Sequence, residues 1–283
     1  MRTDGQKSGS AAKISIIMGV WNPDLSGLSR CIDSLIGQKF QSWELLLYDD
    51  GSQREIGGNI RRIAGCDNRI VCLGSDTNHG LAVALNACIQ TAQAPYIARM
   101  DGDDIAFPER LEEQYAFLET YPQYQWVGST AQLIDEHGMW GILSVPERPQ
   151  AEDFLINSPF IHPSVLFRRE VFTHTGGYCT DKSVAQLEDY ELFMRLYGLG
   201  LRGYNIQHPL IGYHEDLAAH RRRTYSRRIR EMRLRRHGFQ EMGILRPSTL
   251  PYMLKPLFVG LIPADIHHAL RRKMKGERGK NNG

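Results

Sequence analysis

Residues 96–104 read YIARMDGDD, a short apolar segment that runs directly into a loop in which three of four residues are acidic. Three further apolar segments with the character of buried strands precede it, at residues 13–21, 43–48 and 69–73. Apolar residues at helical spacing lie between these segments, at residues 28–36, 56–63 and 81–92. This alternation predicts an α/β fold with a doubly wound, mostly parallel, Rossmann-like sheet that carries helices on both faces.

The pattern changes after about residue 110. Residues 111–120 and 187–197 have the character of helices, residues 126–134 and 163–168 that of strands, and residues 135–138 that of a hairpin turn. We therefore expect a mixed region packed on the first one. Without an internal repeat or a low-complexity linker, the chain is expected to form one domain over residues 13–219. A disordered tail of residues 1–12 would precede it, and a basic, partly apolar helical extension over residues 220–283 would follow.

Charge is distributed unevenly along the 283 residues. The formal net charge is only +2, but residues 1–200 carry 16 Lys and Arg against 26 Asp and Glu, whereas residues 201–283 carry 18 against 6. Nine arginines lie within residues 220–237. Such a density fits an anionic lipid surface, a nucleic acid, or the phosphates of a substrate, and it also fits a solvated helix that packs on the acidic part of the chain.

The residues that follow favour a membrane surface among these partners. Apolar side chains within residues 252–262 are followed by four cations at positions 271, 272, 273 and 275, which is the arrangement of an interfacial segment on an anionic membrane. The five cysteines form no C-x-x-C pair, and residues 1–21 lack the pattern of a signal peptide. We expect a cytoplasmic protein with reduced thiols and no spanning helix, peripheral on the cytoplasmic face of the inner membrane.

Two acidic clusters follow predicted strands, Asp49-Asp50 and the loop of Asp101, Asp103 and Asp104. Loops at the carboxyl ends of parallel strands meet at one edge of the sheet, where ligands bind. Turn formation or helix capping also explains Asp49-Asp50. The second cluster repels itself unless a cation is present, which favours Mg²⁺ or Mn²⁺ clamping a diphosphate. The chain has neither a P-loop nor a G-x-G-x-x-G turn after its first strand, which argues against kinases, ATPases and dehydrogenases.

Five motifs in this order resemble those of family 2 glycosyltransferases, which have the GT-A fold. They are DDGS at 49–52, NHGL at 78–81 with Asn86, ARMDGDD at 98–104 with PERL at 108–111, HPSVLFRR at 162–169, and EDYEL at 188–192. The resemblance covers roughly residues 14–236. It implies an inverting transferase that moves a sugar from a nucleotide-diphosphate donor, with UDP favoured, to a hydroxyl of a glycan or lipid-linked glycan in cell-surface polysaccharide synthesis.

The resemblance also implies roles for single residues. Donor binding falls to Val20, Trp21, Asn22, Asp49, Asp50, Asn78, Gly80, Arg99 and Asp101, with Asp50 at the nucleotide base and Asp101 on the ribose or sugar side. Asp101 and Asp103 would hold Mn²⁺ or Mg²⁺, with His214 or Asp216 as a further ligand. Asp189 would be the general base, a role that Glu188 could exchange with it, and His162 is either an acceptor contact or a structural histidine. Leu85 stands where many members have a basic residue.

Two other functions remain open from the residues alone. A nucleotidyltransferase could use the same acidic loop, although residues 21–24 do not resemble its Gly-rich, basic triphosphate loop. A nucleic-acid-binding protein could use the arginines, but that reading leaves the acidic clusters unexplained, so we expect no nucleic-acid partner.

Overall fold

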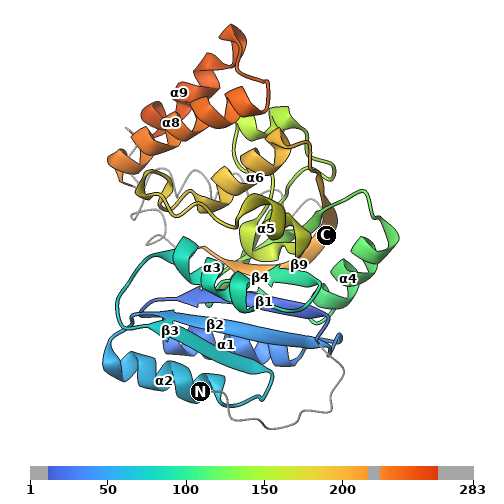
Figure 1. Ribbon diagram of the computed structural model, residues 1–283, viewed down its shortest axis with the longest axis vertical. Helices are drawn as coiled ribbons and strands as arrows, with labels where there is room; N and C mark the ends of the chain where they lie inside the picture. The colour runs from blue at the N-terminus through green and yellow to red at the C-terminus, as the bar shows by residue number, and fades with distance from the viewer. Residues whose placement is uncertain (1–11, 216–223, 261–283) are drawn as a thin grey trace.

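The computed structural model describes residues 12–215 and 224–260. The sequence predicted a tail over residues 1–12, of which residues 1–11 lie outside this description. One sheet runs through the molecule in the order β3-β2-β1-β4-β8-β6-β9-β5, with β7 paired to β6 (Figure 1). The predicted α/β architecture is confirmed.

The first half of the sheet is parallel, as expected. It contains β1 (Ile14–Val20), β2 (Trp43–Asp50), β3 (Ile70–Ser75) and β4 (Tyr96–Arg99), all running in one direction. Helices α1 (Leu25–Ile36), α2 (Arg54–Ala64) and α3 (Leu81–Thr91) connect these strands. Asp24 begins α1 by accepting hydrogen bonds from the backbone N–H groups of Ser26 and Gly27, the arrangement of an N-cap.

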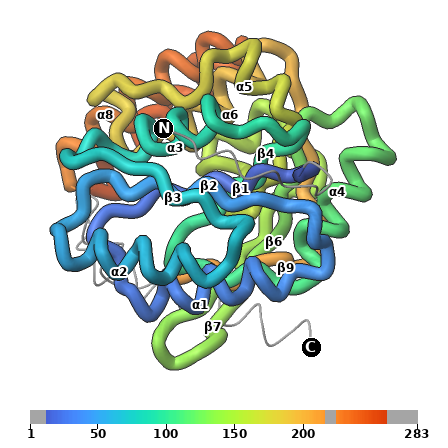
Figure 2. The backbone as a smooth tube through the Cα atoms, turned by 60° about the horizontal axis from the view of Figure 1, so that its bottom comes forward, coloured from blue at the N-terminus to red at the C-terminus, as the bar shows by residue number. Residues whose placement is uncertain are grey.

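Alternation of side chains along β1 explains why helices cover both faces. Ile14 and Ile16 pack in one core with Leu28 of α1, whereas Ile17 packs in the other with Leu85 of α3. All these side chains are buried, as a parallel strand between two helical layers requires. Figure 2 shows α1 and α2 on one side of β1–β3 and α3 on the other.

The second half of the sheet is mixed. It contains β5 (Ile105–Ala106), β6 (Trp126–Asp135), β7 (Gly138–Leu143), β8 (Leu166–Arg168) and β9 (Gly203–His214), with α4 (Arg110–Thr120), α5 (Glu170–Thr175) and α6 (Glu188–Gly198) beside them. β8 is antiparallel to β4 and to β6, and β9 is parallel to β6. The mixed region and the β6–β7 hairpin are confirmed.

Two details differ from the sequence prediction. The strand expected at residues 163–168 begins only at Leu166, because His162–Ser164 form a 3₁₀ turn with Pro163 in its first turn. β9 was not predicted, because its sequence GYNIQHPLIGYH contains a proline and several polar residues and lacks a regular alternation. It is a strand through its long pairing with β6, in which irregularities next to Thr130 accommodate the segment around Pro209.

The described C-terminal residues, 224–260, are mainly helical. It contains α8 (Tyr225–Glu241) and α9 (Leu250–Val259), which lie beside α6 at one end of the molecule (Figure 1). Leu234 and Phe239 of α8 pack in the same core as Phe193 of α6. Within the described residues, no helix is both long enough and apolar enough to cross a bilayer.

Candidate functional site

The loops that follow β1 and β2 are tied together by their own polar groups. The backbone N–H of Asn22 donates to Oγ of Ser52 at 2.8 Å, and Oδ1 of Asn22 accepts from the N–H of Gln53 at 2.9 Å. Beside this junction, the indole of Trp21 is 58% exposed, whereas Val20 is buried. The three predicted donor-binding residues 20–22 therefore lie at the carboxyl edge of the sheet, with an exposed aromatic surface.

The two carboxylates at the end of β2 accept hydrogen bonds from different loops. Oδ1 of Asp49 accepts from the N–H of Ser52 at 3.0 Å. The Asp50 carboxylate instead reaches across to the loop before α3, where it accepts from the N–H of His79 at 3.0 Å and that of Gly80 at 2.7 Å. Gly80 has φ +94°, which is accessible mainly to glycine. The DDGS and NHGL motifs, separated in sequence, thus form one connected structure in which Asp50 is adjacent to the 78–80 loop.

The acidic loop after β4 lies against this edge. Gly102 packs so closely on the end of β1 that an added Cβ would lie 3.0 Å from Cγ1 of Val20. The thiol of Cys31 donates to the carbonyl of Asp101 at 3.2 Å, which anchors the loop from α1. The structure thus brings the β4 loop against the end of β1 and against α1. The Asp49-Asp50 cluster, which the sequence predicted to lie near this loop, ends β2 on the other side of β1 in the sheet.

The three carboxylates of that loop have different environments. The side chains of Asp101 and Asp103 are 33% and 58% exposed, whereas Asp104 is buried. Burial raises the pKa of Asp104 well above its usual range, and the charges of Asp101 and Asp103 add to this effect. Oδ1 of Asp104 accepts from the backbone N–H of His214 at 2.8 Å, so Asp104 connects the loop to β9.

This connection places His214 next to the exposed carboxylate. Nδ1 of His214 lies 3.8 Å from Oδ2 of Asp103. Within residues 12–215 and 224–260, no three His, Cys, Asp or Glu side chains are grouped so that they could hold a metal by themselves. An Asp–His pair nevertheless fits Mg²⁺ or Mn²⁺, because such ions are commonly held by one or two protein groups together with phosphate oxygens and water. Asp216, the alternative ligand, lies outside the described residues.

Arg99 is a buried cation at the centre of the site. Only 1% of its side chain is exposed, and its Nη2 lies 2.5 Å from Oδ1 of Asp101. Its charge lowers the pKa of His162, Tyr178 and Asp189, although burial is the larger influence on each. Arg99 thus lies between the acidic loop and a second group of polar side chains.

Tyr178 organises this second group. Asn86 of α3 pairs with its backbone, accepting from the Tyr178 N–H at 2.8 Å and donating to the Tyr178 carbonyl at 2.9 Å. A Cβ at Gly177 would lie 2.4 Å from Oδ1 of Asn86, so only glycine permits this approach. The Tyr178 hydroxyl lies 2.7 Å from Nε2 of His162. Burial, with a smaller contribution from Arg99, keeps the pKa of His162 well below its usual range, so this histidine is neutral.

Glu188 and Asp189 begin α6. Burial raises the pKa of both carboxyl groups, whereas the charge of Arg227 lowers it. Oε1 of Glu188 accepts from the N–H of Gln186 at 2.9 Å. Acids in the first turn of a helix are stabilised by its dipole, which helps to keep them ionised.

A comparison with protein families identifies the family of this chain. The model of the family described as glycosyl transferase family 2 matches residues 15–176, which is more than half of the chain. The chain belongs to glycosyl transferase family 2. The resemblance found in the motifs is thereby confirmed, and the protein is a glycosyltransferase.

Two curated relatives match this family 2 glycosyltransferase over nearly its whole length. EpsE of Bacillus subtilis, named as a glycosyltransferase, is 34% identical over 93% of this chain and 95% of its own. The amylovoran biosynthesis glycosyltransferase AmsE of Erwinia amylovora is 27% identical over 92% of this chain and 98% of its own.

Solved structures show the same fold at low sequence identity. The mannosyltransferase PcManGT from Pyrobaculum calidifontis, in complex with GDP-Man and Mn²⁺, has a TM-score of 0.59 at 17% identity and covers 94% of this chain and 81% of its own. TarS residues 1–349 of S. aureus, in complex with UDP, has a TM-score of 0.60 at 16% identity and covers 87% of this chain and 70% of its own. The predicted GT-A fold is confirmed.

Sequence reasoning did not find every residue of the site. Tyr178 and Arg227 were not singled out, although the pair of glycines at residues 176–177 signals an unusual backbone immediately before Tyr178. Both glycines adopt positive φ. Arg227 is one of nine arginines within residues 220–237, and only its position on α8 distinguishes it from the others.

Proposed function

We propose that this family 2 glycosyltransferase transfers a sugar, with inversion, from a UDP-sugar to a hydroxyl of a glycan or lipid-linked glycan in cell-surface polysaccharide synthesis. The observation that carries the proposal is the acidic loop after β4, in which buried Arg99 pairs with Asp101 at 2.5 Å and exposed Asp103 lies 3.8 Å from His214. The charge of Arg99 also lowers the pKa of Asp189. AmsE, which is named for amylovoran biosynthesis, supports the polysaccharide role, and TarS in complex with UDP supports the nucleotide.

The donor would bind along the carboxyl edge of the sheet. The exposed indole of Trp21 offers a surface beside the nucleotide, and Val20 and Asn22 line the same pocket. Asp50 would bind the base beside the loop of Asn78 and Gly80, since a carboxylate has about four lone-pair positions and can accept further donors. Asp49 supports this pocket from the DDGS turn.

Asp103 and His214 would hold Mn²⁺ or Mg²⁺ near the diphosphate, with Asp101 beside them on the sugar side. When bound, the ion supplies charge neutralisation for the departing nucleoside diphosphate. Mn²⁺ in the PcManGT complex supports a divalent ion. Arg99, paired with Asp101, restrains that carboxylate and adds a fixed positive charge next to the acidic loop.

Asp189 would take the proton of the acceptor hydroxyl. A base must lie across the sugar from the phosphate, because the hydroxyl attacks in line with the leaving group. A pKa raised by burial brings a carboxylate closer to the range in which a general base works well at neutral pH. Glu188, whose Oε1 accepts from the N–H of Gln186, is the alternative base. His162, in contact with Tyr178, would line the acceptor side.

A donor screen tests this proposal. The protein with Mn²⁺ or Mg²⁺ is mixed with a lipid-linked glycan acceptor and each of several UDP- and GDP-sugars, and the release of free nucleoside diphosphate is measured. Acceptor-dependent UDP release, with inverted configuration in the product, is expected. Release of GDP alone would refute the UDP assignment, and a product with retained configuration would refute the mechanism.

We also propose that α9 contacts the cytoplasmic face of the inner membrane. Leu250, Tyr252 and Phe258 are 43%, 40% and 67% exposed, and the cation Lys255 lies on the same helix. Apolar side chains next to cations suit an anionic lipid surface. Flotation with anionic and neutral liposomes tests this: the full chain should float with anionic vesicles, and a Phe258→Ser variant should float less. Equal partitioning of both proteins would refute it.

A further inference from the structure

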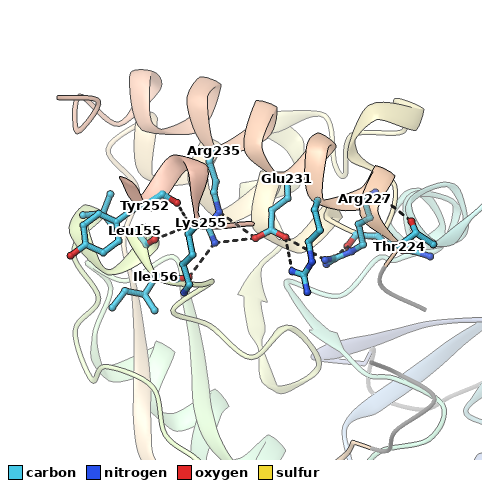
Figure 3. A network of polar contacts seen from close by, with 10 residues as sticks. Leu155, Ile156, Thr224, Arg227, Glu231, Arg235, Tyr252 and Lys255 are labelled. Atoms are coloured by element: carbon cyan, nitrogen blue, oxygen red, sulfur yellow. Dashed lines mark hydrogen bonds and ion pairs between the residues drawn. The ribbon is translucent and has the colours of Figure 1, made fainter. Parts of the chain in front are cut away.

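The arginines of α8 are largely engaged within the protein. The guanidinium of Arg235 is 1% exposed and donates to the carbonyls of Leu155 at 2.8 Å and Ile156 at 3.1 Å, while its Nη2 lies 3.0 Å from Oε1 of Glu231 (Figure 3). Lys255 of α9 donates to the same Ile156 carbonyl at 3.0 Å. This network fixes α8 against the core and thereby restrains the position of its first turn.

Arg227, in that first turn, contacts the segment that leads into α6. Its Nε and Nη2 donate to the carbonyl of Gln186 at 3.2 and 2.9 Å, and its Nη1 lies 3.4 Å from Oε2 of Glu231. One turn later, Arg230 donates to the neighbouring carbonyl of Ala185 at 3.3 Å. Two arginines of α8 thus hold two consecutive carbonyls immediately before Glu188.

The peptide groups of Gln186 have an unusual geometry. Gln186 adopts φ +65°, a left-handed conformation that is unfavourable for a residue with a Cβ atom and persists only when its surroundings enforce it. Its N–H donates to Oε1 of Glu188, while its carbonyl accepts from Arg227. The residue that Arg227 holds is therefore the one that orients the first carboxylate of α6.

We propose that Arg227 is a positioning residue, which holds Gln186 so that the first turn of α6 presents Asp189 and Glu188 to the acceptor. This inference rests on the proposed function, in which Asp189 is the base. It assigns part of the basic C-terminal segment a role in ordering the catalytic carboxylates, a role that needs neither a membrane nor a nucleic acid.

Charge supports the same conclusion. Among residues 12–215 and 224–260, the titratable groups coupled electrostatically to Asp189 include Glu188 and Tyr190 on α6, Arg99 from β4, Tyr178 from the loop before α6 and Arg227 from α8. Arg227 opposes the effect of burial by lowering the pKa of both acids of α6. Removing its charge therefore raises the pKa of Asp189. On acidification, the variant should then lose activity at a higher pH than the wild type does.

Arg228 provides a matched control. It is the next residue on α8, its side chain is 13% exposed against 16% for Arg227, and it lies 3.2 Å from the same Oε2 of Glu231. Of the two, only Arg227 donates to the Gln186 carbonyl. The experiment compares Arg227→Gln, Arg227→Lys and Arg228→Gln by kcat, donor KM, the pH profile of kcat, UDP affinity and thermal unfolding.

Arg227→Gln should lower kcat by about 10- to 100-fold with UDP affinity and donor KM almost unchanged, because small displacements of a catalytic group cost rates of this size. The acidic limb of its kcat–pH profile should lie at higher pH than in the wild type. In Arg227→Lys, that limb should return towards its wild-type position. Arg228→Gln should keep the wild-type profile. Equal losses in the two Gln variants, in proportion to their lowered unfolding temperatures, would overturn the proposal.

The Asp189→Asn variant distinguishes a failure of the proposed function from a failure of the positioning role. If Asp189→Asn keeps normal turnover, the base assignment is wrong whatever the arginine variants do. If Asp189→Asn is inactive while Arg227→Gln has the wild-type kcat and pH profile, only the positioning role is wrong.

Discussion

The two halves of the proposed site are built in different ways. One is the donor edge, formed by the loops of Asn22, Asp50 and Asp103, and the other is the acceptor side, which contains His162, Tyr178 and Asp189. At the donor edge, the residues proposed to act lie at or just after the ends of β1, β2 and β4, and the loops are joined by hydrogen bonds between backbone N–H groups and side-chain oxygens, such as Asn22 N–H to Ser52 and Gly80 N–H to Asp50. On the acceptor side, the segment before α6 is held by Arg227 of the distant helix α8, and the charges of Arg227 and Arg99 lower the pKa of Asp189, which burial raises. The parallel sheet therefore specifies one half of the site, and tertiary packing specifies the other.

This difference means that the two halves should respond separately to mutation. In the proposed function, the groups of the donor edge would hold the nucleotide, whereas those of the acceptor side would act on the incoming hydroxyl. A variant of the acceptor side should lower turnover and leave UDP binding unchanged, whereas a variant of the donor edge should change UDP binding as well as turnover.

The largest effect is expected for Asp189→Asn. Loss of a general base typically costs 10²- to 10⁴-fold, so we expect kcat to fall by about 1,000-fold. UDP binding, measured by titration calorimetry with Mn²⁺, should remain at the wild-type value because the residue lies outside the donor edge. A variant with Glu188→Gln alone is the matched control and should lose less. Comparable losses in both would show that the two acids share the role.

Asp103→Ala should differ from Asp189→Asn by changing UDP binding as well as turnover. The wild-type protein should bind UDP more tightly with Mn²⁺ than without it, and the variant should lose this enhancement because its exposed carboxylate is the proposed ligand. Turnover should fall on the order of 100-fold. Asp24→Ala, which removes an acid at the N-cap of α1, should retain the metal enhancement. Retained enhancement in Asp103→Ala would exclude this residue as a ligand.

The same contrast explains what the sequence could predict. The parallel strands, the helices between them and the acidic loops could be predicted, since each depends on local periodicity and on residues at strand ends. β9 could not, because GYNIQHPLIGYH is a strand only through its pairing with β6. Nor could the role of Arg227, because nine similar arginines differ only in which part of the fold they face.

Asn86→Ala sharpens the comparison, because Asn86 lies on α3 in the first half but holds the acceptor side. It removes two hydrogen bonds to the backbone of Tyr178, each worth about 1 kcal/mol, so the free energy of unfolding should fall by about 2 kcal/mol. Urea unfolding measures this, and kcat should fall while UDP affinity is unchanged. Asn59→Ala, whose side chain bonds within and beside α2, should change stability by less than about 0.5 kcal/mol. Weakened UDP binding in Asn86→Ala would instead place Asn86 at the donor edge.

The smallest effect concerns the protonation of His162. The pKa of this histidine is lowered by burial and by Arg99, so below about pH 6.5 the unfolded chain binds a proton that the folded protein does not. The stability that this group contributes is complete above pH 6.5 and is lost as the pH falls towards the folded-state pKa. Between pH 7.5 and 5.5 the loss should be on the order of 1 kcal/mol.

Urea unfolding of the wild type and of His162→Asn at both pH values isolates this contribution, because the remaining ionisable groups are common to the two proteins. His162→Asn should be less stable than the wild type at pH 7.5, since it loses the contact with Tyr178, but its stability should fall less on acidification. A decrease of the same size in both proteins would mean that His162 accepts a proton in the folded state, and the acceptor side would then be more open to water than the buried Tyr178–His162 contact indicates.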